Sequence, residues 1–232
     1  MTESRAARTP LSPTSRSTLT RYRDRAAADR GALDAVLDDG LICHLGVLLH
    51  GAPVVLPTTY GRDGDTLYLH GSTGAGNLRA ALAEPVSVAV THLDGIVYAR
   101  SAMHFSMNYR SAVIHGRAVE LTDREERLHG LRAVVEHAAP GSWDYVRPPT
   151  NKELAATMVL ALDLTEASVK TRAAGPSDDP ADLGSDVWAG VLPVRQVFEK
   201  PVPAADLASD IDLPEHVRAR VSSASAPVRA RS

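Results

Sequence analysis

The chain has 232 residues, of which 44% are hydrophobic but only 4% aromatic, and its formal net charge at pH 7 is −3. This length predicts one large domain whose core consists mainly of Val, Leu and Ala. The small negative charge excludes a general nucleic-acid binder and a membrane-surface protein. No apolar run in the sequence reaches the roughly 20 residues that a membrane span needs. The N-terminus lacks the apolar segment of a secretory signal, so we expect a cytoplasmic protein.

The residues most often used in catalysis and metal binding form no known motif. The single cysteine, Cys43, excludes an internal disulfide framework, and its apolar surroundings predict a buried, unreactive thiol. The nine histidines show neither H-x-x-x-H nor H-E-x-x-H spacing, so we predict no metal site. There is no G-x-S-x-G motif, and no Ser or Cys has a base partner defined by a motif.

The composition divides the chain into a domain and two tails. Residues 1–20 are rich in Ser, Thr, Arg and Pro, which predicts a disordered N-terminal segment. We expect the folded domain over residues 21–200 and a mostly disordered C-terminal segment over residues 201–232. The domain begins with a helix that Asp29 caps and that ends at Gly40, and an apolar strand follows.

A hairpin is expected next in the chain. Its strands, over residues 53–60 and 65–72, flank an Asp-Gly pair whose glycine supplies the positive φ of a tight turn. The second strand leads into a glycine-rich loop and a short helix. Two interpretations fit this junction: its free N–H groups, with Asn77 and Arg79 nearby, hold a monophosphate, or it is an ordinary connection between loop and helix.

The remaining elements are strands and two capped helices. Thr122 and Thr150 each precede a Glu by three residues, which predicts capping boxes at two helix starts. Residues 109–111 (Tyr-Arg-Ser) either bind an anion or ring edge or pair across a subunit interface. Tight turns imply antiparallel pairing, so we predict a mainly β chain, a barrel or sandwich, with appended helices. The further strands are expected over residues 86–92, 96–102, 112–121, 158–164 and 167–172, the first two as a hairpin around Asp94-Gly95.

Four segments in a fixed order resemble a known family. They are Pro53–Tyr60 (PVVLPTTY), Gly64–Ser72 (GDTLYLHGS), Ser106–Ser111 (SMNYRS) and Val187–Pro193 (VWAGVLP). Over residues 21–195 the chain resembles the pyridoxamine 5′-phosphate oxidase-like flavin-binding proteins, particularly the branch near the nitroimidazole-resistance reductases. This resemblance implies an α+β fold, mainly β with appended helices, built on a six- or seven-stranded antiparallel split β-barrel. It also implies a homodimer that binds FMN in a groove between the two barrels.

The resemblance further implies which residues surround the FMN. The strand through Val55 would face the isoalloxazine edge, the end of the next strand would follow the ribityl chain, and the glycine-rich loop would approach the phosphate. His104 and Tyr109 are candidates for substrate-side groups, and no catalytic residue is assigned. The implied cofactor-binding residues, some contributed by the partner subunit, are Val55, Leu56, Pro57, Thr58, Tyr60, His70, Gly71, Ser72, Gly76, Asn77, Arg79, Tyr109, Arg110, Ser111, Lys170 and Trp188.

Departures from the family pattern bear on the expected reaction. The true oxidases hold the phosphate with a Ser-Arg-Lys cluster, where this chain has Ala75-Gly76-Asn77. Their substrate-binding Trp/Arg arrangement has no match here beyond Trp188. We therefore expect transfer of hydride or electrons from NAD(P)H to a small-molecule acceptor, with the flavin doing the chemistry, rather than oxidation of vitamin B6. Two alternatives stay open: a flavin-binding or sensing protein without turnover, and a split barrel that binds haem or deazaflavin F420.

Overall fold

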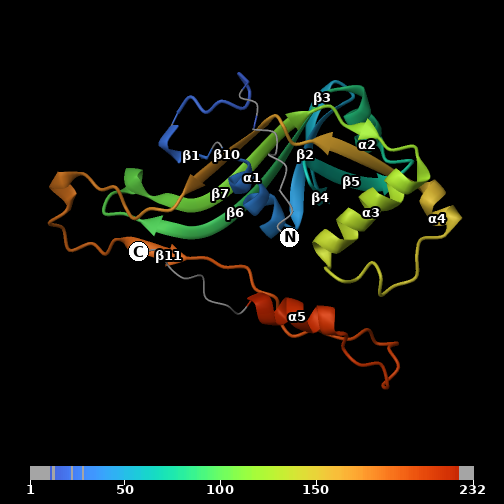
Figure 1. The fold of residues 1–232 in the computed structure, drawn as a ribbon. Coiled ribbons are helices and arrows are strands. Elements are labelled where there is room, and N and C mark those ends of the chain that lie inside the picture. The colour runs from blue at the N-terminus through green and yellow to red at the C-terminus, as the bar shows by residue number, and fades with distance from the viewer. Residues whose placement is uncertain (1–10, 12–13, 22, 28, 225–232) are drawn as a thin grey trace, which may run out of the picture.

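The computed structural model describes residues 11, 14–21, 23–27 and 29–224. Their strands form two antiparallel sheets that pack around one apolar core (Figure 1). The larger, sheet A, has the order β1 (Ala26–Ala27), β10 (Ala167–Arg172), β7 (Ser106–Gly116), β6 (Val86–Tyr98), β2 (Ile42–Leu49) and β3 (Ala52–Thr59), and β11 (Gly190–Pro193) pairs with β6. The smaller, sheet B, has the order β4 (Gly61–Asp63), β5 (Thr66–Ser72), β9 (Thr157–Asp163) and β8 (Val119–Glu120).

The helices cover the sheets and connect them. Helix α3 packs so closely on sheet B that a Cβ at Gly61 would lie 2.4 Å from the Ala133 carbonyl carbon. A side chain at Gly130 of α3 would likewise meet Val159 and Tyr68. The helices are α1 (Arg30–Asp39), α2 (Gly76–Ala83), α3 (Arg124–Ala138), α4 (Asn151–Ala156) and α5 (Glu215–Ala224), with short 3₁₀ turns η1 (Arg23–Arg25), η2 (Ala102–His104) and η3 (Pro180–Asp182).

Helix α1 begins and packs as its sequence predicts. The Asp29 carboxylate accepts a hydrogen bond from the Ala32 N–H at 2.8 Å, which satisfies one of the free donors of the first turn. Leu33, Val36 and Leu37 are 0–2% exposed and enter the core. The helix thus supplies an apolar face to the core that both sheets share.

The chain passes from sheet A to sheet B at Tyr60. This residue is 0% exposed, and its hydroxyl donates to the Leu37 carbonyl oxygen at 2.5 Å, with the Gly40 carbonyl oxygen 3.1 Å away. The His137 ring of α3 lies against it, with 4.5 Å between ring centroids. Burial raises the pKa of the Tyr60 hydroxyl above its ordinary range. Tyr60 therefore joins α1, α3 and both sheets at one corner.

The predicted hairpin of residues 53–60 and 65–72 is wrong in its pairing. Strand β3 pairs with β2, while β5 pairs with β4 and β9. The tight turn is real, because Gly64 has φ +54°, but it joins β4 to β5. The corner at Tyr60 ends β3 and leads the chain into β4 of sheet B, so the two predicted strands lie in different sheets. The alternating pattern of apolar and polar residues gives no sign of such a corner.

The predicted turn at Asp94-Gly95 is also wrong. Strand β6 runs through it as one 13-residue strand, with a β-bulge between Leu93 and Gly95 in its pairing with β7. Strand β11 pairs along the same stretch, so a Cβ at Gly95 would lie 3.0 Å from Val191 Cγ1. The glycine permits this close approach of a neighbouring strand instead of a turn.

The two predicted capping boxes have different outcomes. At α4, Thr150 and Glu153 form the reciprocal pair of hydrogen bonds that defines the box, as predicted. At α3 the N-cap is Asp123, one residue later than predicted, and its carboxylate accepts from the Glu125 and Glu126 N–H groups. A carboxylate that can reach two N–H groups replaces the threonine hydroxyl there.

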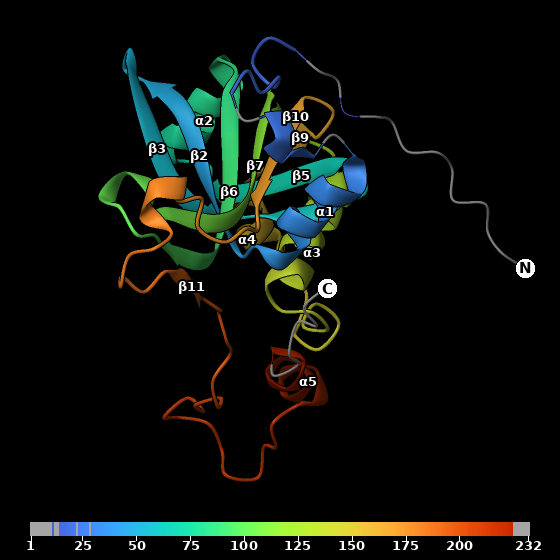
Figure 2. The ribbon, with the colours of Figure 1, turned by 90° about the vertical axis from the view of Figure 1, so that its left-hand side faces the viewer.

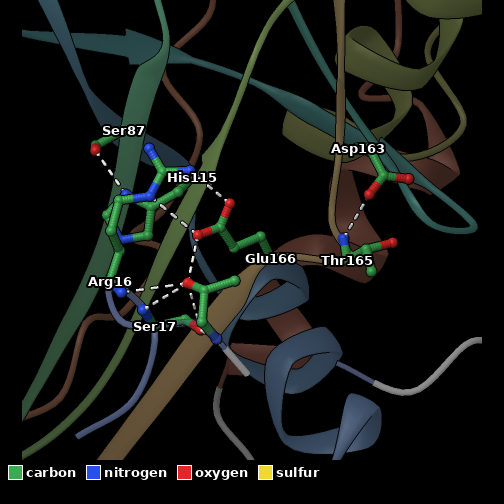
Figure 3. Close-up of polar contacts among 8 residues, drawn as sticks. Arg16, Ser17, Ser87, His115, Asp163, Thr165 and Glu166 are labelled. Carbon is green, nitrogen blue, oxygen red and sulfur yellow. Dashed lines mark hydrogen bonds and ion pairs between the residues drawn. The ribbon is translucent and has the colours of Figure 1, made fainter. Parts of the chain in front are cut away.

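Parts of both predicted tails contact the folded body. Residues 1–10 and 12–13 lie outside the described residues, but Arg16 pairs with Glu166 at 2.6 Å (Figure 3). The Thr14 hydroxyl also donates to that carboxylate. At the other end the chain leaves β11 as an extended arm that ends in α5 (Figure 2). The His216 ring of α5 lies 5.0 Å from that of Tyr145. This helix stands in a segment for which composition predicted disorder.

None of the helices in the described part of the chain has the length and apolar character to cross a membrane.

Replacing Tyr60 with Phe removes the corner hydrogen bond while keeping the ring. We expect the free energy of unfolding to fall by about 1–2 kcal/mol, because the Leu37 carbonyl oxygen of α1 loses this buried donor. Urea unfolding followed by circular dichroism measures the change. Tyr145→Phe is the matched control, since Tyr145 is 59% exposed. Equal stability of Tyr60→Phe and the unmodified protein would contradict a structural role for this hydroxyl.

Candidate functional site

The face of sheet A that points away from the core carries small and apolar side chains. Its central row runs across five strands through Pro57, His44, Ala89, Val113 and Ser168, which are paired in register. We call this surface the outer face. The neighbouring positions Ile42, Leu48 and Val55 are 46%, 50% and 65% exposed. The outer face is therefore open and largely apolar in the single chain, as a protein interface would be.

The predicted flavin-edge strand is the edge strand of sheet A. Strand β3 pairs with β2 alone among the described strands, so main-chain groups along its other side are open to a ligand. Alternation divides the four predicted residues between two faces. Val55 and Pro57 point to the outer face, whereas Leu56 and Thr58 pair with the buried Leu45 and Cys43. Cys43 is 0% exposed, and this burial raises the pKa of its thiol to about 12. Both observations fit the buried, unreactive thiol that the sequence predicts.

The start of α2 lies beside the β2–β3 turn. A Cβ at Gly76 would be 4.0 Å from Leu49, the last residue of β2. The N-cap residue Ala75 provides no side-chain hydrogen bond, so the N–H groups of the first turn are available to an anion. Arg79 donates through Nε and Nη2 to the Thr73 carbonyl oxygen, at 3.1 and 2.8 Å, and so holds the loop in place. Ser72 supports the same loop, because its hydroxyl accepts from the Gly74 N–H at 3.2 Å.

His70 and Gly71 point to opposite faces of β5. A Cβ at Gly71 would lie 2.8 Å from Leu78 of α2. His70 shares its face with Tyr68, which contacts His129 of α3, so it lies on the α3 side of sheet B. Burial lowers the pKa of His70, and its Nδ1 has no hydrogen-bond partner among the described residues. We therefore leave His70, together with the fully buried Tyr60, out of the site proposed below.

Alternation also separates the predicted group Tyr109-Arg110-Ser111. Ser111 faces outward beside Lys170, its partner in register on β10, and Tyr109 shares that face. Arg110 points the other way and pairs with Asp94 at 3.1 Å and Asp39 at 2.6 Å. These three residues line a cavity of about 750 Å³ between α1, β6 and the C-terminal arm. Arg110 is thus engaged by two carboxylates on the inner side.

Two groups of side chains on the outer face, one on β7 and β10 and the other on β3, lie far apart within one chain. Lys170 and Ser111 stand on β10 and β7, while Val55 and Pro57 stand on β3. Four strand spacings separate β10 from β3 and three separate β7 from β3, which at about 4.8 Å each gives about 19 Å and about 14 Å along the sheet. A single isoalloxazine ring cannot touch both groups of the same chain. If both contribute to one site, one of them must come from a second copy.

Trp188 and His104 lie at the end of β6 opposite to α2. The Trp188 side chain is 67% exposed and lies edge-on to Tyr98, with 5.6 Å between ring centroids. His104 ends the short turn η2, and its Nδ1 lies 3.1 Å from the Ser101 hydroxyl. Within one chain, Trp188 and His104 therefore lie away from the predicted site residues at the start of α2. Sequence reasoning did not predict Asp39, Asp94 or His44 as site residues. Asp39 and Asp94 meet Arg110, and His44 meets Pro57 and Ala89, only in the folded chain.

Two antiparallel sheets around one core, with an edge strand beside a helix start, define a split β-barrel protein. The family model described as pyridoxamine 5′-phosphate oxidase matches residues 29–171, and the chain belongs to this family. The predicted split-barrel fold and family resemblance are thereby confirmed. No curated protein matches the chain.

Two of the solved structures similar to this chain are more than 35% identical to it in sequence. The flavocytochrome Anf3 from Azotobacter vinelandii is 36% identical, covers 91% of this chain and 99% of its own, and has a TM-score of 0.86. The FAD and haem binding protein from Mycobacterium smegmatis is 37% identical, with 85% and 97% covered and a TM-score of 0.82. A 5-nitroimidazole antibiotic resistance protein from Bacteroides thetaiotaomicron, 21% identical with 62% and 85% covered, shares the fold at a TM-score of 0.55.

The lowered pKa of His70 predicts acid sensitivity. The folded state holds this imidazole neutral, so the unfolded state binds protons more readily, and stability falls as the pH drops below about 6.5. His70→Gln removes this contribution and flattens the dependence of the unfolding free energy between pH 7 and 5, measured by urea titration. His50→Asn is the control, because His50 is exposed in a turn at φ +53°, which Asn adopts readily. Equal slopes in all three proteins would show that His70 is not held neutral.

Proposed function

We propose that the chain is a flavin-binding redox protein that works as a homodimer, with each flavin between the outer face of one subunit and β3 of the other. The open apolar outer face supports the pairing of two copies, and so does the separation of about 19 Å between β10, which carries Lys170, and β3, which carries Val55. The observation that carries the flavin assignment is the uncapped start of α2 beside the edge strand β3, in a chain of this family.

The charges near α2 favour FAD over the FMN predicted from sequence. A phosphate monoester carries close to two negative charges at pH 7, whereas each phosphate of a pyrophosphate carries about one. The start of α2 offers main-chain N–H groups and Asn77, while Arg79 commits two donors to the Thr73 carbonyl oxygen. A site rich in N–H groups and poor in available cations suits a pyrophosphate. The name of one relative, an FAD and haem binding protein, agrees with this choice.

The protein would contribute binding and orientation to the reaction. A bound flavin supplies the exchange between a two-electron donor such as NAD(P)H and the acceptor. Main-chain groups of β3 would hold the ring edge, and Val55 and Pro57 would exclude water from it. Tyr109, Ser111 and Lys170 of the second copy would line the opposite wall. No side chain of this set has to act as a general acid or base.

Asn77→Asp tests the phosphate end of this site. A new carboxylate at the helix start repels the phosphate, so we expect FAD affinity to fall at least tenfold, measured by fluorescence titration of the flavin-free protein. Asn151→Asp is the matched control, because it adds the same charge at the start of α4. Equal affinities for Asn77→Asp and the unmodified protein would place the phosphate elsewhere.

The visible spectrum of the purified protein tests the function itself. Flavin bands that bleach on anaerobic addition of NADPH support an oxidoreductase. Bands that persist support the alternative of a flavin-binding protein without turnover, and absence of flavin bands contradicts the proposal. Acid extraction followed by chromatography identifies the released flavin, and we expect FAD.

A second candidate function is haem binding, which the names of the two relatives at 36% and 37% identity favour. Among the described residues, His44 fits an axial ligand best. Its exposed imidazole stands on the outer face beside Ala89, Pro57 and Gly46, and it forms no hydrogen bond within the described part of the chain. Small neighbours leave room for a flat macrocycle, and neutral imidazole is a common haem ligand.

His44→Ala tests the haem assignment. We expect the unmodified protein to show a sharp Soret band and the variant to lose it, because the iron loses an imidazole ligand. His50→Asn is the control, since His50 is also exposed but lies in the β2–β3 turn. A Soret band of unchanged position and intensity in His44→Ala would exclude this histidine. The haem content of each protein is measured as the pyridine haemochrome.

A further inference from the structure

Three possible metal ligands meet at the end of β6 opposite to α2. The ligand atoms of His104, Asp179 and Asp182 all lie within 4.8 Å of one another. They come from two segments, since His104 closes the turn between β6 and β7 and the aspartates belong to the loop between β10 and β11. We propose that these residues bind a divalent first-row cation of the Zn²⁺ type, a site that is independent of flavin and haem.

The backbone around the aspartates presents both carboxylates on one side. Asp179 is the N-cap of η3 and Asp182 is its last residue, three positions on, and positions three apart in a 3₁₀ turn lie above each other. The Asp182 N–H donates to the Asp179 carbonyl oxygen at 2.9 Å, which closes the turn. The Asp179 side chain makes no capping hydrogen bond, so its oxygens remain available as ligands.

The histidine is oriented by a neighbour, as in many metal sites. The Ser101 hydroxyl lies 3.1 Å from His104 Nδ1, and it forms no capping bond of its own. When Nδ1–H donates to this hydroxyl, the Nε2 lone pair is the one left for an ion, and such a partner fixes ring and tautomer. One imidazole nitrogen and two carboxylate oxygens match the donors that Zn²⁺ and related cations take, with water completing the shell.

The local charge is not balanced by the protein. Asp178 lies next to the cluster on the same loop, and Arg100 binds it through bonds of 2.6 and 2.7 Å from its Nη1 and its backbone N–H. Neither Asp179 nor Asp182 forms an ion pair within the described part of the chain. A dication at this point would offset two carboxylate charges. It would also tie the loop that carries Trp188 to the β6–β7 turn at a second point beside the Arg100 bond.

Calorimetric titration of the full-length protein with ZnCl₂, after treatment with a chelator and desalting, tests the site. We expect one equivalent to bind, and binding to weaken at least tenfold in His104→Ala and in Asp182→Asn. Asp186→Asn is the matched control, because Asp186 is an exposed aspartate of the same loop outside the cluster. Unchanged affinity in the two cluster variants, an equal loss in Asp186→Asn, or no binding by the unmodified protein would each overturn the proposal.

Limited proteolysis gives a second readout that reports the loop itself. Leu183 and Trp188 are 59% and 67% exposed and offer cleavage sites to chymotrypsin. We expect Zn²⁺ to slow cleavage at these two residues in the unmodified protein but not in Asp182→Asn at the same zinc concentration, as followed by mass spectrometry. Equal protection of both proteins would show that zinc acts on the protease or on another site, and would contradict the proposed one.

Discussion

The buried hydroxyl of Tyr60 is the point on which the arrangement of the barrel depends. The chain leaves the edge of sheet A and enters sheet B at this residue, and the hydroxyl binds carbonyl groups at the end of α1. The His137 side chain of α3 donates to the same Gly40 carbonyl oxygen at 2.5 Å. A hydrogen bond between groups with no access to water is expensive to leave unmade, so the corner has one favourable geometry. Because the chain turns into sheet B at this corner, β4 does not pair with β3, and β3 remains the edge strand of sheet A.

In the proposed dimer, the edge strand and the outer face of one chain would each supply half of a site. Because side chains alternate along a strand, Arg110 and its neighbours Tyr109 and Ser111 cannot serve one ligand together. Arg110 instead fastens β6 and β7 to the end of α1 through Asp94 and Asp39. What remains on the outer face is small, apolar or aromatic, with Lys170 at its margin. Such a surface favours contact with a second copy over solvent.

Local signals in the sequence predicted the elements better than their partners. The cap at Asp29, the box at Thr150 and the glycine turn at Gly64 depend on a few adjacent residues, and all three are present. Pairing depends on residues far apart, so the corner at Tyr60 and the bulge in β6 were missed. The same limit applies to sites. Family resemblance located the split barrel, but the burial of Tyr60 and the outward or inward direction of each strand residue required the folded chain.

The arginines show how the fold distributes its positive charge. Arg100 binds Asp178, Arg110 binds two carboxylates, and Arg79 binds the carbonyl oxygen of Thr73, so each is used to hold two segments together. For Arg100 and Arg110 the carboxylate partners offset the positive charge, so these guanidinium groups attract an added anion less. Arg79 gives two of its five N–H donors to a neutral carbonyl oxygen and keeps its charge. An anion at the start of α2 would then depend on main-chain N–H groups, whose directions the helix determines. In the proposed site, the position of α2 against β2 would therefore contribute as much to anion binding as the side chain of Arg79.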